Sequence, residues 1–386
     1  MNIRLKKLVS YLRLCSSISM LSFMIVGCSS DNAPKPHLIP TMENMEKVSV
    51  PWNINKLSDS IAGSFVPVLD NNAIFTADSK GDILRLDDTD GTIISNFKLD
   101  RPLSSGTAVS GTAIFVTTTD GYLLSISKVT GEINWEAALP TISIEAPQIG
   151  GDIVVVRTND TQLSAYDAKN GALLWVYQKS NPPLTLRTYN TFQVIAKDVV
   201  ILGEPSGKLA LINLNNGMPL WEDSLAIPKG STDLDKLTDI GMRPVLNDKT
   251  ICVATYNGKI ACLDALNSNV LWSKDFSANL GLIIDDQNIY TLSTDGTLFA
   301  FDKASGAKLW KNDILQYREL NIPTFLGNNI LVFDNEGYVN LFRKTDGRLI
   351  SRVKTNLEGG VSYSITDPNK VILQSGNGHI AKINSN

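Results

Sequence analysis

Histidine is almost absent from this sequence, which has only His37 and His379 among its 386 residues. Neither histidine has a second histidine or a cysteine at the short spacing that zinc sites use. The sequence also lacks the Gly-x-Ser-x-Gly, His-Glu-x-x-His and phosphate-binding glycine motifs. These absences count against a zinc enzyme, a serine hydrolase and a nucleotide-binding protein.

Long apolar runs are confined to the first 27 residues. There, basic side chains precede an apolar stretch that is too short for a comfortable membrane span and is typical of a signal peptide. The stretch ends in Ile-Val-Gly-Cys28, which resembles a bacterial lipobox. This resemblance implies that residues 1–27 are removed and that Cys28 carries the lipid, whereas the alternative is an ordinary signal peptide with an incidental cysteine. Ser29, in place of an aspartate, is similar to lipoproteins that are sent to the outer membrane.

Basic residues are in deficit in the chain that follows the leader. Four of the 35 basic residues and none of the 39 acidic residues lie in the leader, so 31 basic residues face 39 acidic ones. A net charge of about −8 makes nucleic acid a poor partner, because phosphate binding needs a basic patch. Residues 28–47 contain three prolines and little apolar periodicity. We expect them to form a lipidated flexible tether.

A repeat with a fixed internal spacing dominates the rest of the sequence. A turn glycine is followed 14 residues later by tryptophan or serine in unit after unit, with Thr161 replacing the glycine once. The seven pairs are Gly81/Ser95, Gly121/Trp135, Thr161/Trp175, Gly207/Trp221, Gly258/Trp272, Gly296/Trp310 and Gly337/Ser351. Such regularity at a period of about 40 residues indicates a repeat architecture.

Each unit contains four short segments with the composition of β-strands. Asp120-Gly121, Asn257-Gly258 and Asp295-Gly296 separate apolar runs and favour two-residue hairpin turns, because these residues tolerate positive φ. Four antiparallel strands in each unit of about 40 residues are typical of a propeller blade. The sequence therefore predicts an all-β, eight-bladed β-propeller that spans residues 48–386.

The second half of each unit resembles the quinoprotein-type (PQQ-like) repeat, Ala-x-Asp-x-x-x-Gly-x-x-x-Trp. Ala165, Asp167, Gly171 and Trp175 match this pattern fully. We interpret its residues as structural: the glycine closes a turn, the aspartate accepts backbone N–H groups and the tryptophan fills the gap between blades. The tryptophans assigned to blade docking are Trp52, Trp135, Trp175, Trp221, Trp272 and Trp310.

The last unit is incomplete, and a fragment near the start of the chain can complete it. Its turn glycine is Gly378, so its tryptophan-bearing strand would centre on position 392, beyond the last residue, Asn386. Trp52 stands in a strand-like segment without a unit of its own. We expect residues 48–54 to supply the outer strand of the last blade and so to close the ring.

Two inner cysteines have two possible states. Cys262 occupies the small alanine position of its unit, where a buried thiol behaves as a small apolar group. A two-residue turn at Asn257-Gly258 would pair residue 253 with Cys262 and turn Cys252 to the opposite face. Free thiols are therefore expected, and a disulfide in an oxidising periplasm is the alternative if the register is bulged.

Two junctions between blades are longer than the others. Equivalent tryptophans are mostly separated by 38–41 residues, but by 46 from Trp175 to Trp221 and by 51 from Trp221 to Trp272. The additional residues form loops 179–191 and 226–244, which we expect on one face of the ring. Loops on a rigid scaffold often bind partners. The alternative is that they are solvated loops whose leucines pack onto the blades.

The lipobox, the tether, the eight repeats and the two loops together resemble the BamB family of outer-membrane assembly lipoproteins. The resemblance implies a non-enzymatic scaffold in the Bam complex, monomeric within it, that binds the periplasmic POTRA region of BamA and assists unfolded outer-membrane proteins. Leu184, Leu186 and Arg187 match the family's Leu-x-Leu-Arg contact residues. In the family's Asp-x-Asp motif only Asp239 carries over, because Gly241 replaces the second aspartate.

The resemblance also implies a location on the periplasmic side of the outer membrane and no cofactor besides the lipid on Cys28. One alternative is a propeller that binds a cell-wall polymer or another lipoprotein. A quinone-dependent dehydrogenase is a second alternative, but the sequence has no adjacent cysteines and no evident cation-binding cluster. Residues 231–239 resemble a calcium loop only loosely, since the central glycine and the final glutamate are missing.

Overall fold

The computed structural model describes residues 34–40, 45–59, 64–186, 188–189, 191–195, 198–278 and 280–385. The predicted leader, Cys28 and Arg187 lie outside these ranges. The fold described below is that of residues 36–386, which form one unit. Within the described ranges, no helix has the length and apolar character that a membrane span requires.

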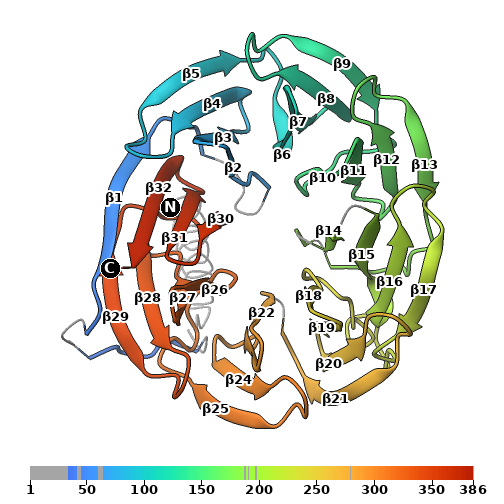
Figure 1. The fold of residues 1–386 in the computed structure, drawn as a ribbon. Helices are drawn as coiled ribbons and strands as arrows, with labels where there is room; N and C mark the ends of the chain where they lie inside the picture. Colours follow the sequence, from blue (N-terminus) through green and yellow to red (C-terminus); the bar gives the residue numbers. More distant parts are fainter. Residues whose placement is uncertain are drawn as a thin grey trace, which may run out of the picture. The chain divides into compact units, whose positions relative to one another are not determined.

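Eight antiparallel sheets of four strands each are arranged as a ring (Figure 1). Blade 1 contains β2 (Val68–Asp70), β3 (Ala73–Ala77), β4 (Asp82–Asp87) and β5 (Ile93–Lys98), and blade 2 contains β6 (Leu103–Ser110), β7 (Ala113–Thr118), β8 (Tyr122–Ser127) and β9 (Ile133–Ala138). Blade 3 contains β10 (Gln148–Gly150), β11 (Ile153–Arg157), β12 (Leu163–Asp167) and β13 (Leu173–Tyr177). Blade 4 contains β14 (Phe192–Ile195), β15 (Val199–Glu204), β16 (Lys208–Asn213) and β17 (Pro219–Ser224), with the 3₁₀ turn η1 (Pro205–Gly207) between β15 and β16.

The second half of the ring repeats this order. Blade 5 contains β18 (Val245–Asn247), β19 (Thr250–Ala254), β20 (Gly258–Asp264) and β21 (Val270–Phe276), and blade 6 contains β22 (Leu282–Ile284), β23 (Asn288–Leu292), β24 (Leu298–Asp302) and β25 (Lys308–Asn312). Blade 7 contains β26 (Thr324–Leu326), β27 (Asn329–Phe333), β28 (Tyr338–Arg343) and β29 (Leu349–Lys354). Blade 8 contains β30 (Val361–Asp367), β31 (Lys370–Ser375), β32 (His379–Ser385) and β1 (Val48–Asn55). The predicted all-β, eight-bladed propeller is confirmed.

The hydrophobic core lies between neighbouring blades. The second strands are rich in β-branched and aromatic residues, which suit a pleated surface that is covered on both faces. Val155 and Leu163 of blade 3, for example, pack in one cluster with Val200 and Leu202 of blade 4. Neighbouring blades therefore share a common core.

The first strand in sequence closes the ring, as predicted. β1 pairs antiparallel with β32, with Trp52 opposite Lys382 and Ile54 opposite Ile380 (Figure 1). Trp52 is buried, and its indole Nε1 donates to the carbonyl oxygen of Asp88 in blade 1 at 3.2 Å. The N-terminal segment is thus the outer strand of the last blade.

The other five tryptophans make the same contact around the ring. Each indole Nε1 donates to a backbone carbonyl in the following blade, for instance from Trp175 to Leu214 at 2.6 Å. The ring of Trp175 also lies against Gly217, where an added Cβ would come within 2.6 Å of the indole. A glycine at this turn is therefore required by the neighbouring tryptophan as well as by its positive φ of 71°.

The hairpin turns between the second and third strands of the blades have three residues, so the prediction of two-residue turns at these positions was wrong. In blade 1, Asp78 and Asp82 flank the loop, and the third loop residue, Gly81, has a φ of 99°. Such a loop combines an ordinary turn with one left-handed residue. The sequence does not readily distinguish a two-residue hairpin loop from a three-residue one, because both favour glycine after an aspartate or asparagine.

The additional loop residue changes the cysteine prediction. Thr255 and Lys259 flank the turn in blade 5, so Cys252 pairs with Cys262 rather than facing away from it. The two buried cysteines form a disulfide between the adjacent strands β19 and β20. The expectation of free thiols was wrong because a shift of one residue in register moves every side chain of a strand to the other face.

Candidate partner-binding site

The two long loops meet on one face of the ring, and Asp239 joins them. Its carboxylate accepts the backbone N–H of Leu186 in loop 179–191 at 2.7 Å. It also accepts the N–H of Ser206, in the turn between β15 and β16, at 2.8 Å. Asp239 is only 4% exposed. Its side chain therefore holds the loops in place and is not itself available on the surface.

The leucines of loop 179–191 differ in exposure. Leu184 is 42% exposed, whereas Leu186 is half-buried beside loop 226–244. Arg187 lies outside the described residues, and nothing is said of its side chain. The loop thus presents one apolar side chain to solvent next to a second that is anchored at its backbone by Asp239.

Gly241 allows the two loops to approach closely. A Cβ at this position would lie 2.9 Å from Cγ2 of Thr188 and 3.3 Å from Cδ1 of Leu186. An aspartate there would displace loop 179–191 from its present position. The packing of the two loops in this chain therefore favours glycine at position 241.

A polar pocket of about 160 Å³ lies beneath the two loops. Glu145 accepts the backbone N–H of Thr191 at 2.8 Å and its hydroxyl at 2.5 Å. Arg157 donates to the carbonyl oxygen of Gly203 at 2.9 Å and lies 3.9 Å from the Glu145 carboxylate. Both charged side chains are buried. They connect the base of loop 179–191 to blades 3 and 4.

Comparison with known proteins identifies the family of this chain. The family model described as outer membrane protein assembly factor BamB matches residues 79–312. The outer membrane protein assembly factor BamB of Bordetella pertussis is 33% identical over 365 residues, which cover 93% of this chain and 94% of the relative. The chain belongs to the BamB family.

A further relative carries the same description, and two solved structures share the fold. The BamB protein of Nitrosomonas eutropha is 32% identical and covers 87% of this chain and 82% of its own length. The crystal structure of BamB from Moraxella catarrhalis has a TM-score of 0.79 at 24% identity, with coverage of 88% of this chain and all of that chain. A quinohemoprotein alcohol dehydrogenase from Comamonas testosteroni, at 13% identity and a TM-score of 0.70, covers 88% of this chain and 77% of its own and shares the fold.

The second loop of this BamB-family chain is only partly exposed. Leu237 and Ile240 are buried against the blades, as the alternative interpretation of the loops requires. Ile227 and Leu234, in contrast, are well exposed. The sequence did not mark them as functional, because apolar residues recur throughout this loop. Loop 226–244 thus also presents apolar side chains to solvent.

Asp235 of the second loop is explained by local hydrogen bonds. Asp235 accepts the backbone N–H of Thr232 at 3.1 Å and of Ser231 at 3.3 Å, and hydrogen bonding to Thr232 lowers the pKa of its carboxyl. Among the described residues, no group of three His, Cys, Asp or Glu side chains is arranged to hold a metal ion. Asp235 thus shapes its own turn.

The buried pocket also predicts a pH-dependent stability. Burial raises the pKa of Glu145 above its ordinary value of 4.5, although Arg157 and Thr191 oppose this shift. A raised native pKa contributes stability that is complete below pH 4.5 and is lost as the pH rises through the native pKa. Glu145→Gln removes this proton linkage. We expect the melting temperature of the wild type to fall relative to that of the variant as the pH increases from 4.5.

Thermal melts of both proteins across the pH series test this expectation. Glu132→Gln is the control for loss of a carboxylate, because Glu132 is exposed and lies in an outer turn of blade 2. Parallel pH profiles for the wild type and Glu145→Gln would show that Glu145 has an ordinary pKa in the native state.

Proposed function

We propose that this protein is a non-catalytic scaffold of outer-membrane protein assembly that binds the periplasmic POTRA region of BamA. Its membership of a family of assembly factors supports the general role. The observation that carries the specific proposal is the joining of two long loops by Asp239, which leaves Leu184 exposed beside Leu186. An apolar anchor next to an arginine is a common centre of protein interfaces.

The remaining parts of the proposal concern the anchor and the clients. Cys28 carries the lipid and holds the protein on the periplasmic side of the outer membrane, and no other cofactor is involved. The tether, residues 28–47, joins the anchor to the ring. The protein acts as a monomer within the Bam complex and assists unfolded outer-membrane proteins on their way to BamA.

Photo-crosslinking from position 184 tests the partner without assuming it. We expect p-benzoylphenylalanine in place of Leu184 to form an adduct with BamA in intact membranes, and protease mapping should place the adduct in the POTRA region. The control carries the same group in place of Leu266, which is exposed on an outer turn of blade 5. No BamA adduct from position 184, or an equal adduct from position 266, would contradict the proposal.

A further inference from the structure

The outer strands of the blades carry apolar side chains that face solvent. In blades 1 to 6 these occupy one or both of the two positions just before the tryptophan or its serine replacement. In blade 3, Leu173 is 57% exposed and Leu174 is 46% exposed. The other exposed members are Ile93, Ile94, Ile133, Leu220, Val270, Leu271 and Leu309. A ring of apolar side chains at the free edges of sheets is unusual, because natural proteins tend to protect such edges.

Blade 7 shows what covers these positions when they are not exposed. The equivalent residues, Leu349 and Ile350, are only 6% and 1% exposed. Met45, in the segment before β1, donates its backbone N–H to the carbonyl oxygen of Ile350 at 2.8 Å. Ile39 packs in the same cluster as Leu349. The described residues 36–40 and 45–47, here called the covering segment, thus contact blade 7 at its apolar pair.

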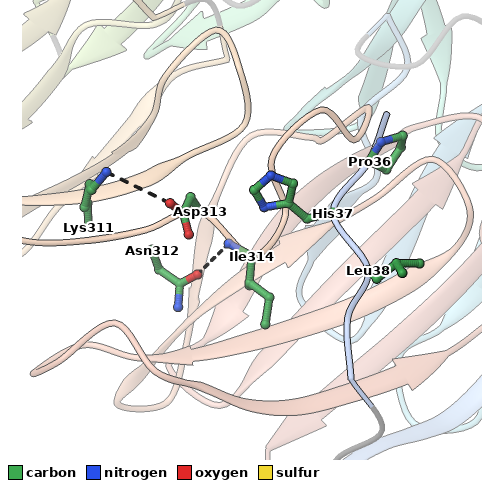
Figure 2. A pocket seen from close by; sticks show the side chains of 7 residues that line it. All are labelled: Pro36, His37, Leu38, Lys311, Asn312, Asp313 and Ile314. Atoms are coloured by element: carbon green, nitrogen blue, oxygen red, sulfur yellow. Dashed lines mark hydrogen bonds and ion pairs between the residues drawn. The ribbon is translucent and has the colours of Figure 1, made fainter. Parts of the chain in front are cut away.

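Contacts further upstream hold this covering segment in place. The backbone N–H of His37 donates to the carbonyl oxygen of Gln316 at 3.2 Å, and Arg318 donates to the carbonyl oxygen of His37 at 3.0 Å. Figure 2 shows Pro36, His37 and Leu38 beside residues 311–314 of blade 6. The described residues at the end of the predicted tether, 36–40 and 45–47, therefore contact the ring through their backbone and through Ile39.

Blade 3 has the least protected of the exposed edges. β13 is the last strand of its sheet, and its sequence, Leu-Leu-Trp-Val-Tyr, contains neither a charged residue nor a proline. Val176 is exposed on it together with Leu173 and Leu174. Every other outer strand carries a charged side chain or, in β1, Pro51. Charges and prolines are the usual means of blocking an edge.

We propose that the free edge of β13 binds an extended, alternately apolar segment of an unfolded outer-membrane barrel protein. The segment pairs with the backbone of β13, starting from the kind of hydrogen bond that the N–H of Met45 donates to Ile350 of β29, and its apolar side chains cover Leu173, Leu174 and Val176. Strands of such barrels alternate apolar and polar residues over about ten positions, which suits a pairing of this kind. The inference rests on the proposed function for the identity of the client.

The position of β13 connects this edge to the proposed partner site. β13 ends at Tyr177, and loop 179–191 follows at once. Lys179 binds Glu222 of blade 4 at 2.9 Å, which fixes the start of the loop on the ring. A client segment on β13 would therefore lie next to the loop that carries Leu184. The edge of β13 would bind the client, and loop 179–191 would bind the assembly machinery, in one region of the protein.

Photo-crosslinking with a defined client tests the proposal. The mature lipidated protein in detergent carries p-benzoylphenylalanine in place of Leu174 and meets a urea-unfolded eight-stranded outer-membrane barrel protein on dilution. We expect an adduct with the unfolded barrel and none with the folded one. The matched control replaces Leu271, which is equally exposed on β21 but lies near Lys274 and Asp275. It should give a clearly weaker adduct.

A charged side chain introduced on the edge of β13 provides a second test. Val176→Lys places a charge on the edge, and we expect it to reduce the adduct about fivefold or more without changing the melting temperature. It should leave binding to the BamA POTRA region unchanged, whereas Leu186→Ala with Arg187→Ala should lose that binding and keep the client adduct. An undiminished adduct in Val176→Lys, an equal adduct from position 271, or an adduct with a second copy of this chain would overturn the proposal.

Discussion

Trp52→Ala should lower the free energy of unfolding by about 3–5 kcal/mol, the usual cost of removing a buried tryptophan. The side chain is 7% exposed and packs with Leu84 of blade 1 and Ile380 of blade 8. Its loss leaves a cavity at the only junction where the ring is closed by strands from opposite ends of the sequence. Urea unfolding followed by circular dichroism measures the change.

Removal of β1 should have a still larger effect. A chain that begins after residue 56 leaves β32 as an unpaired edge and exposes Ile372 and Ile380. We expect this chain to aggregate or to melt well below the intact protein. Trp310→Ala, at a junction where the chain is continuous, is the control for loss of a tryptophan alone. Normal folding of the truncated chain would show that β1 does not close the ring.

Leu186→Ala combined with Arg187→Ala should abolish binding to the BamA POTRA region with little change in stability. Leu186 is half-buried at the rim of the loops, so its truncation removes few core contacts. Asp239→Ala should behave differently, because it leaves the backbone N–H groups of Leu186 and Ser206 without their acceptor. We expect it to weaken binding and also to cost about 1–3 kcal/mol of stability.

Urea unfolding and a POTRA binding titration on the same preparations separate these two roles. A stable Asp239→Ala protein with weakened binding would make Asp239 a direct contact. Weakened binding together with reduced stability agrees with Asp239 as the residue that positions the loop.

The architecture could be predicted from the sequence because the repeat has no insertions within its units. The units that share the 14-residue spacing indicated the number of blades. The unit of Gly378 lacks its tryptophan-bearing strand, and this identified the segment around Trp52 as the closing strand. The face of the sheet to which each side chain of a hairpin points was predicted less accurately. Loops of two and three residues use the same dipeptides, so the pairing of Cys252 with Cys262 was missed.

The candidate site was predicted in part. Unequal spacing between tryptophans located both loops, and the structure brings them together on one face. The buried position of Asp239 could not be inferred, because a carboxylate that accepts backbone N–H groups from a distant loop leaves no local pattern. The Glu145–Arg157 pair was missed for the same reason, since its residues belong to different strands and meet only through the fold.

Binding of purified mature protein to the isolated BamA POTRA region tests the central claim most directly. Calorimetric titration of the wild type and of Leu186→Ala with Arg187→Ala, each checked by its thermal melt, gives the comparison. We predict saturable binding by the wild type and none by the double variant at an unchanged melting temperature. Equal binding by both folded proteins would contradict the assignment of this face as the BamA-binding site.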